Sequence, residues 1–167
     1  MEKLRGSHAI AHNGGINGFS TYAVRLPHEK VYVALLTNSD SGIAAADVVG
    51  RKAAAVAIGK PFPELTVIKL DKAVLDAFVG TYKVDDATKR VVHREGDRLF
   101  MQRSGRAKVE LFPASPARFF MKDSLVTVTF GRDANGRVDR VMLQDDGVDT
   151  VNHKSDETPV VEKATDM

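Results

Sequence analysis

The stretch RVVHREGDRLFMQR, residues 90–103, carries the pattern that decides how the second half of this chain folds. Two short runs rich in apolar and β-branched residues flank Glu95-Gly96-Asp97, a sequence that favours a tight hairpin turn. Similar turn sequences recur at intervals of about eight to twelve residues, which is typical of a strand meander. They are Ser104-Gly105, Asn135-Gly136 and Asp146-Gly147. The spacing predicts an all-β region of about eight short antiparallel strands, closed into a small barrel or sandwich because closure removes exposed strand edges.

Residues 1–60 carry a different pattern, which predicts strands followed by a helix. FSTYAVRL, residues 19–26, alternates between polar and apolar positions, as a half-buried strand does. KVYVALLTN, residues 30–38, is a continuous apolar run suited to a strand buried on both faces. A helix is expected from about Ser41, with Asp40 or Ser41 as its N-cap. This region is therefore expected to be α+β, with a partial antiparallel sheet and one closing helix.

The chain is expected to divide into four segments. Gly59 and Pro61 end the predicted helix, and the residues that follow contain two prolines and little periodicity, as a linker does. A short helix with the sequence DKAVLDAF then precedes the predicted strands. The expected segments are 1–60 for the sheet and helix, 61–70 for the linker, 71–153 for the barrel and 154–167 for a polar, disordered tail.

The composition excludes several classes of function. The formal net charge is only +2 at pH 7, and lysines and arginines are scattered among acidic residues, so no nucleic-acid partner is expected. The absence of cysteine excludes disulfides and thiolate metal sites, and no cofactor is expected. No apolar run reaches the ~18 residues of a membrane-spanning helix, and no signal peptide is recognisable. The sequence leaves the compartment and the oligomeric state open.

The stretch AHNGGINGFSTYAV, residues 11–24, stands out because its glycines follow a His-Asn pair and precede a predicted strand. Glycine beside a strand indicates a bulge, a tight bend, or a place where another group approaches the backbone closely. A phosphate loop is not expected, because GGING lacks the spacing of the dinucleotide and Walker motifs and leads into a strand instead of a helix.

Two other groups of polar residues favour structural roles. His8 and His12 are four positions apart, but Ala9 stands where a zinc-protease motif has glutamate, and the nearby glycines oppose a helix. No metal site is therefore expected. The pairs Asp85-Asp86 and Asp145-Asp146 lie in predicted turns, where aspartate is favoured because it hydrogen-bonds the local backbone.

The segment His12-Asn13-Gly14, followed by further glycines and Phe19, resembles the third signature of the serine β-lactamase and penicillin-binding-protein superfamily. In the branch with class C β-lactamases, esterases and D-aminopeptidases, the Lys-Thr-Gly box of that signature is often His-x-Gly. The order of strand, turn, strand and long helix that follows also resembles the end of that catalytic domain. The later phrase Leu75…Phe78-Val79-Gly80-Thr81-Tyr82 resembles the opening of the lipocalin-like barrel domain appended to many of these proteins.

The resemblance implies roles for five residues. Acyl transfer passes through an oxyanion that backbone N–H groups stabilise, and the N–H of Gly15 would be the second such donor. His12 would line the cleft near the nucleophile, where it hydrogen-bonds a substrate carboxylate or helps to pass a proton. Asn13 would contact that carboxylate or orient His12, Gly14 would let the strand pack closely under the nucleophile, and Ile16 would contact the substrate. The substrate stays open among β-lactams, D-amino-acid peptides and esters, and the resemblance implies a periplasmic or secreted parent protein.

The sequence departs from this family at the nucleophile. No serine is followed three positions later by lysine, and no tyrosine is followed by x-Asn, so the other two signatures are missing. We therefore expect the C-terminal part of a longer serine hydrolase, inactive alone. Its open strand edges and faces are expected to be covered by homo-oligomerisation or by packing on the barrel.

Two other functions also fit the predicted barrel. It could hold a small apolar ligand, as lipocalin-like barrels do, or it could be a structural module that regulates access to a catalytic domain. The first of these needs an open cavity, whereas we favour the interpretation that the same side chains simply fill a core. The positions concerned are Leu99, Met101, Leu111, Phe119, Val128 and Met142.

Overall fold

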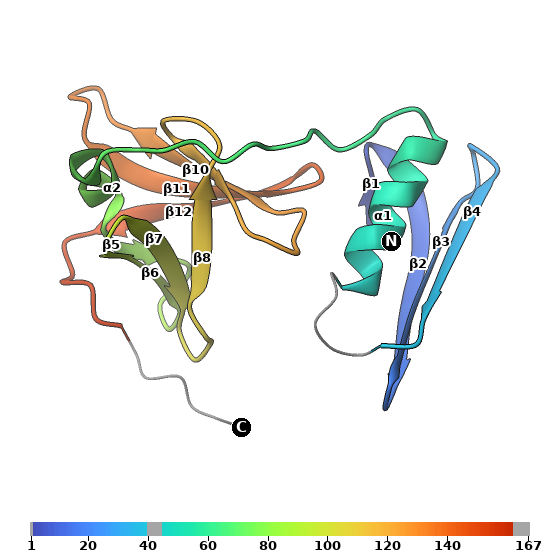
Figure 1. Cartoon of the computed structure of the whole chain (residues 1–167). Helices are drawn as coiled ribbons and strands as arrows, with labels where there is room; N and C mark the ends of the chain where they lie inside the picture. The colour runs from blue at the N-terminus through green and yellow to red at the C-terminus, as the bar shows by residue number, and fades with distance from the viewer. Residues whose placement is uncertain (1, 40–44, 162–167) are drawn as a thin grey trace. The chain divides into compact units, whose positions relative to one another are not determined.

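The computed structural model describes residues 2–39 and 45–161, which form two compact units (Figure 1). The first unit is built mainly from residues up to Glu64 and the second mainly from residues from Leu65 onward. Twelve strands and two short helices lie in these residues, so the chain is mostly β. The first unit contains an antiparallel sheet and one helix, as predicted, but its four strands dominate the part described, so the α+β class is not supported.

An antiparallel sheet in the order β1-β2-β3-β4 forms the first unit (Figure 1). Tight turns join its strands: Arg5 and Gly6, both with positive φ, connect β1 to β2, and Gly18, with a φ of +82°, follows β2. The strands are β1 (Glu2–Leu4), β2 (Ser7–Ile16), β3 (Phe19–Leu26) and β4 (Val31–Thr37).

Helix α1 (Ala46–Ala57) covers one face of this sheet (Figure 1). Val24 and Leu26 of β3 and Ala54 of α1 are almost fully buried in the shared core. Gly50 allows the close approach, because a Cβ atom there would lie 2.3 Å from Cδ1 of Tyr22. The helix ends as the sequence predicts: Gly59 has a φ of +69° and its N–H donates to the carbonyl of Val56.

The opposite face of the sheet carries large apolar side chains that are exposed within the unit. Tyr32 and Leu36 of β4 are 67% and 77% exposed, so the prediction of a strand buried on both faces is wrong. Val31, Val33 and Leu35, which alternate with them, pack toward the helix side. The strand therefore has one buried face, although its sequence is apolar from Val31 to Leu36.

The second unit is a closed antiparallel barrel, as the turn spacing predicted (Figure 1). Each strand pairs with the next along the chain, and β12 pairs with β5 to close the cylinder. The turns are those read from the sequence, with φ of +65° at Gly96 and of +48° and +90° at Asp146 and Gly147. The strands are β5 (Gly80–Lys83), β6 (Lys89–Glu95), β7 (Arg98–Arg103), β8 (Val109–Pro113), β9 (Arg118–Phe120), β10 (Thr127–Arg132), β11 (Val138–Asp145) and β12 (Val148–Ser155).

Helix α2 (Lys72–Phe78) lies at one end of the barrel and supplies Leu75 and Phe78 to its core (Figure 1). The Phe78 ring stacks on Phe130 with centroids 4.4 Å apart and meets Phe119 edge to face at 5.4 Å. Such aromatic pairs add to the stabilisation from apolar burial.

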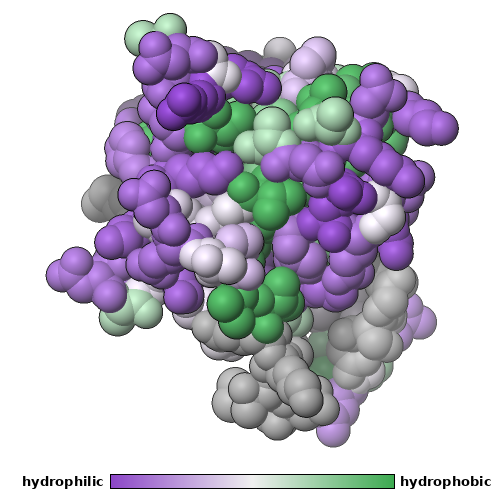
Figure 2. Space-filling model, turned by 90° about the vertical axis from the view of Figure 1, so that its left-hand side faces the viewer, coloured by the Kyte–Doolittle hydropathy of each residue, from purple (hydrophilic) through white to green (hydrophobic). Residues whose placement is uncertain are grey.

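In the view of Figure 2 the surface is mainly hydrophilic, with hydrophobic residues in a narrow band.

Two side chains from the barrel hold the C-terminal end of α2. The buried hydroxyl of Tyr82 donates to the carbonyl of Phe78 at 2.7 Å, and Lys154 Nζ donates to the carbonyl of Ala77 at 3.2 Å. Gly80 makes room for the lysine stem, because a Cβ there would lie 2.3 Å from Lys154 Cε. The Phe-x-Gly-x-Tyr phrase of the sequence is thus the device that fixes this helix on the barrel.

Some expected boundaries fall outside the described residues. The predicted N-cap at Asp40 or Ser41 is one of them, and the helix begins at Ala46 without a side-chain cap hydrogen bond. The last part of the predicted tail, residues 162–167, also lies outside them, whereas β12 continues to Ser155. Neither of the two helices described has the length and apolar character required to cross a membrane.

Candidate functional site

The glycine-rich stretch forms the end of β2 next to the turn that joins β2 to β3. The register pairs His12 with Ala23 and Gly14 with Thr21, and residues 12–16 are all exposed. Every residue with an expected role in catalysis or substrate binding therefore lies in one accessible part of the hairpin.

The alternation of the strand divides these residues between two faces. His12, Gly14 and Ile16 share the face opposite α1. Asn13 and Gly15 share the other face, because their neighbour Ala11 packs into the core beneath the helix. The side chains of His12 and Asn13 therefore point to opposite sides of the sheet.

The outer edge of β2 is open beyond Ala9. Strand β1 pairs only with Ser7, His8 and Ala9, and no other described strand lies on that side. The two-residue turn makes Leu4 and Ser7 a hydrogen-bonded pair, so the odd-numbered residues of β2 direct their main-chain groups toward this side. The N–H of Gly15 consequently faces an unpaired edge, where an extended ligand can lie against the strand.

Local contacts explain Gly14 and Gly18 but not Gly15. A Cβ at Gly14 would lie 2.9 Å from Thr21 Oγ1, which donates to the Gly14 carbonyl at 3.2 Å. Gly18 has the positive φ that its turn requires. A Cβ at Gly15 would make only an ordinary contact, 3.6 Å from the Phe19 carbonyl oxygen. The absence of a side chain at Gly15 therefore leaves the strand edge accessible without serving the hairpin itself.

The two histidines near this hairpin do not form a metal site. They lie four residues apart on a strand, which separates them by roughly 13 Å at about 3.3 Å per residue. A shared ion would need both rings within about 2 Å of it. Within residues 2–39 and 45–161, no group of three or more histidine, aspartate or glutamate side chains could hold a metal ion. His8 instead meets the ring of His28 edge to face at 6.4 Å.

The two serines nearest the hairpin have other hydrogen-bond partners. Ser20, which pairs with Gly15, has its hydroxyl 3.0 Å from that of Thr37. Ser7 is buried, and its hydroxyl hydrogen-bonds Glu29, which lowers the pKa of that carboxylate. The Thr37 hydroxyl beside Ser20 is not a base, and the Glu29 carboxylate beside the buried Ser7 is a weaker base than usual because its pKa is lowered.

The two aspartate pairs contribute to turns. Asp85 Oδ1 accepts hydrogen bonds from the main-chain N–H groups of Ala87 and Thr88 at 2.9 and 2.7 Å, and these bonds lower the pKa of its carboxyl group. Asp145 ends β11, and Asp146 has the positive φ of the following turn. The structure thus supports the structural role that the sequence favoured for both pairs.

The side chains proposed to line a ligand cavity pack against one another. Five of the six belong to the buried core of the barrel, and Phe119 also contacts Phe130 edge to face at 5.5 Å. Met142 lies outside this core. These contacts favour a filled barrel over one that encloses an apolar ligand.

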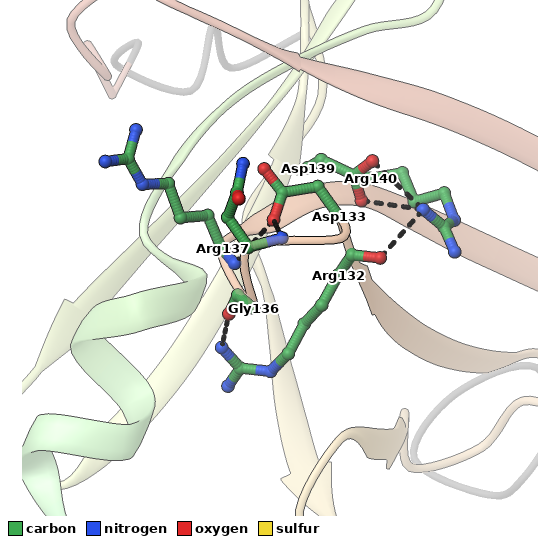
Figure 3. A network of polar contacts seen from close by, with 7 residues as sticks. Arg132, Asp133, Gly136, Arg137, Asp139 and Arg140 are labelled. Carbon is green, nitrogen blue, oxygen red and sulfur yellow. Dashed lines mark hydrogen bonds and ion pairs between the residues drawn. The ribbon is translucent and has the colours of Figure 1, made fainter.

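A polar cluster at the β10–β11 hairpin is also structural (Figure 3). Asp133 Oδ1 accepts from the main-chain N–H groups of Asn135 and Arg137 at 2.9 and 2.8 Å. Arg132 Nη1 donates to the Gly136 carbonyl at 2.6 Å. These bonds close the turn and leave no converging set of catalytic groups.

One charged residue inside the barrel was missed by the sequence analysis. Arg90 shares the interior face of β6 with Val92, which is fully buried. Its Nε donates to Asn152 Oδ1 at 3.0 Å, and Asn152 is only 2% exposed. The alternation in the run RVVHRE could have revealed it, because Arg90 stands two positions before a core valine.

Comparison with known proteins relates the chain to penicillin-binding-protein-like proteins. A family model described as "Domain of unknown function (DUF3471)" matches residues 66–159, which contain the whole barrel. Penicillin-binding protein 4* of Bacillus subtilis (strain 168) is 32% identical over 134 residues. That alignment covers 75% of this chain and 30% of the relative, so the chain spans less than a third of the relative's length.

Solved structures with partial similarity are larger than this chain. The crystal structure of SurE with D-Leu has a TM-score of 0.45 and 20% identity, over 88% of this chain and 35% of SurE. The octameric penicillin-binding protein homologue from Pyrococcus abyssi has a TM-score of 0.37 and 22% identity, over 90% of this chain and 33% of that protein.

Proposed function

The chain belongs to the family described as "Domain of unknown function (DUF3471)", and from this membership and its likeness to penicillin-binding protein 4* we propose that it is the C-terminal part of a β-lactamase-like serine hydrolase. In this proposal the first unit supplies one wall of an acyl-transfer site. The second unit is the barrel appended to it, of the lipocalin-like kind.

The observation that carries the proposal is the open edge of β2 at Gly15. An acyl-transfer site needs N–H donors aimed at the oxygen that becomes negative in the transition state. The N–H of Gly15 points to an edge that no described strand occupies, and no side chain at this position obstructs it. A substrate in extended conformation can lie along this edge as an added strand.

His12, Gly14 and Ile16 would face the substrate from one side of the strand. His12 is exposed and therefore free to donate to a substrate carboxylate or to relay a proton. Asn13 and Gly15 would contact the substrate from the edge and the other face. A role for Asn13 in orienting His12 is disfavoured in this arrangement, because their side chains point apart.

The nucleophile would come from outside this chain. The sequence holds no Ser-x-x-Lys pair, and the hydroxyls of Ser20 and Ser7 are engaged with Thr37 and Glu29. The acyl-transfer reaction therefore requires a partner segment that carries the serine and its base. The substrate class, whether β-lactam, D-amino-acid peptide or ester, depends on that segment.

Two measurements on the full chain test this proposal. Incubation with a fluorescent penicillin and a fluorophosphonate should leave the intact mass unchanged, and a stoichiometric adduct would contradict the missing nucleophile. Titration with N-acetyl-D-alanyl-D-alanine should shift the amide resonances of Ala11, Asn13 and Gly15 more than those of the intervening residues. Gly15→Pro, which removes the proposed donor, should abolish the shifts of the Ala11 and Asn13 amides; if it leaves those two shifts unchanged, the role given to Gly15 is wrong.

A further inference from the structure

Two arginines project from the interior face of the barrel. The register of β5, β6 and β7 places Tyr82, Arg90 and Arg103 in one row. Arg90 alternates with Val92, and Arg103 alternates with Met101, and both of these neighbours are buried in the core. Because side chains two apart on a strand share a face, both arginine side chains leave their strands on the interior side, where Arg90 is half-buried and Arg103 is exposed.

Arg90 reaches toward the end of the barrel away from α2. Its Nε donates to Asn152, which lies one row further from α2 than Lys154, the partner of Tyr82 in the register. Lys154 extends the other way, to the carbonyl of Ala77 in α2. The two ends of the barrel are therefore different: α2 closes one, and a guanidinium anchored to a buried amide lies at the other.

The charge of this arginine pair is poorly compensated. Burial lowers the pKa of the Arg90 guanidinium, and the nearby positive charge of Arg103 acts in the same direction. In the part of the chain that the structure describes, neither arginine forms an ion pair. Asp85 interacts with Arg103 electrostatically, but its Oδ1 already accepts two main-chain hydrogen bonds. An anion between the two guanidinium groups would relieve their repulsion.

We propose that Arg90, Arg103 and Asn152 form a carboxylate-binding site at the mouth of the barrel opposite α2. Arg90 uses its Nε for Asn152, so its Nη1 and Nη2 groups remain to donate in the planar fork that matches a carboxylate. Asn152 fixes the direction of that fork, and the exposed Arg103 supplies the second cation. A monoanion fits better than a dianion, because Asp85 already offsets part of the positive charge.

The ligand is a small molecule that ends in a carboxylate. The side chains deeper in the barrel than Arg90 and Arg103 are packed core residues. The site therefore binds the carboxylate group and has no space for a long apolar tail. This site uses none of the residues of β2 and belongs to the barrel unit. A result for or against this site therefore does not affect the function proposed above.

Side-chain NMR of the full chain tests the site with propionate as the probe. Sodium propionate replaces sodium chloride at constant ionic strength, and the Nε–Hε signals of Arg90 and Arg103 and the side-chain amide of Asn152 are followed. We expect saturable shifts at these three groups. Arg103→Gln should weaken binding about tenfold or more, as loss of a charge-assisted contact does. Arg137→Gln, at an exposed arginine whose side chain points away from its hairpin (Figure 3), should leave affinity within about twofold.

A second variant distinguishes the donor geometry of the Arg90 guanidinium from its positive charge. Arg90→Lys keeps the positive charge but loses the Nε contact to Asn152, and it should also weaken binding about tenfold. If that variant fails to fold, Arg103→Gln decides, since the Arg103 side chain is exposed and has no hydrogen bond within residues 2–39 and 45–161. Shifts that do not saturate, equal shifts with phosphate, or unchanged affinity in Arg103→Gln would each overturn the carboxylate site.

Discussion

Replacing Tyr82 by phenylalanine tests how α2 is held on the barrel. The Tyr82 side chain is fully buried, and its hydroxyl donates to the carbonyl of Phe78 at 2.7 Å. The ring and its contact with Phe130, at 5.9 Å between centroids, are retained in Tyr82→Phe. The substitution therefore removes one hydrogen bond and leaves the aromatic packing in place.

The expected loss follows from the carbonyl that remains. A typical internal hydrogen bond contributes about 1 kcal/mol net, and a buried acceptor left without a partner raises the cost to about 1–3 kcal/mol. The Phe78 carbonyl lies at the end of α2, where the helix provides no donor for it. We expect the free energy of unfolding of the barrel to fall by about 1–2 kcal/mol. Each kcal/mol corresponds to about 4–8 °C in Tm for a unit of this size.

Urea unfolding followed by circular dichroism measures this loss, and amide hydrogen exchange localises it to α2 and β5. Tyr32→Phe is the matched control, because Tyr32 is 67% exposed on the open face of the other unit. That variant should change stability by less than about 0.5 kcal/mol. If the two variants lose equal stability, or if exchange in α2 is unchanged in Tyr82→Phe, the hydroxyl does not hold the helix.

Three further predictions concern packing, the strand edge and pH. Gly50→Ala should destabilise the first unit by about 1–3 kcal/mol in urea unfolding, although alanine favours helices, because its Cβ would collide with the Tyr22 ring; a gain in stability would contradict the close packing. Gly14→Pro should lower hairpin protection in hydrogen exchange more than Gly15→Pro, because only the N–H of Gly14 faces β3; equal losses would reverse the edge assignment. Burial raises the pKa of the Tyr82 hydroxyl, because the folded protein favours its neutral form. The stabilisation from this hydroxyl is therefore complete below pH ~10, the usual pKa of tyrosine, and is lost as the pH rises further. The free energy of unfolding should therefore fall more steeply above this pH in the wild type than in Tyr82→Phe, and parallel pH profiles would refute that assignment.

Local sequence was sufficient for the elements whose physical cause is local. The hairpin turns follow from glycines that adopt positive φ, as Gly96 and Gly147 do, and the end of α1 follows from Gly59 in the same way. The closed barrel followed from the regular spacing of those turns, since strands joined by tight hairpins pair in order. These features need only a few neighbouring residues to specify them.

Tertiary structure decided which face each strand buries and which side chains meet across the fold. The run from Val31 to Leu36 is apolar throughout, yet one face is exposed because α1 covers only the other. The bond from Lys154 to the carbonyl of Ala77 joins residues 77 positions apart, and that from Arg90 to Asn152 joins residues 62 apart. No local pattern encodes such contacts, because they exist only once the barrel closes and brings β12 beside β5. The sequence by itself determined the turns and the strands of the barrel, whereas closure of the barrel placed the half-buried Arg90 guanidinium at its mouth and fixed α2 at its other end.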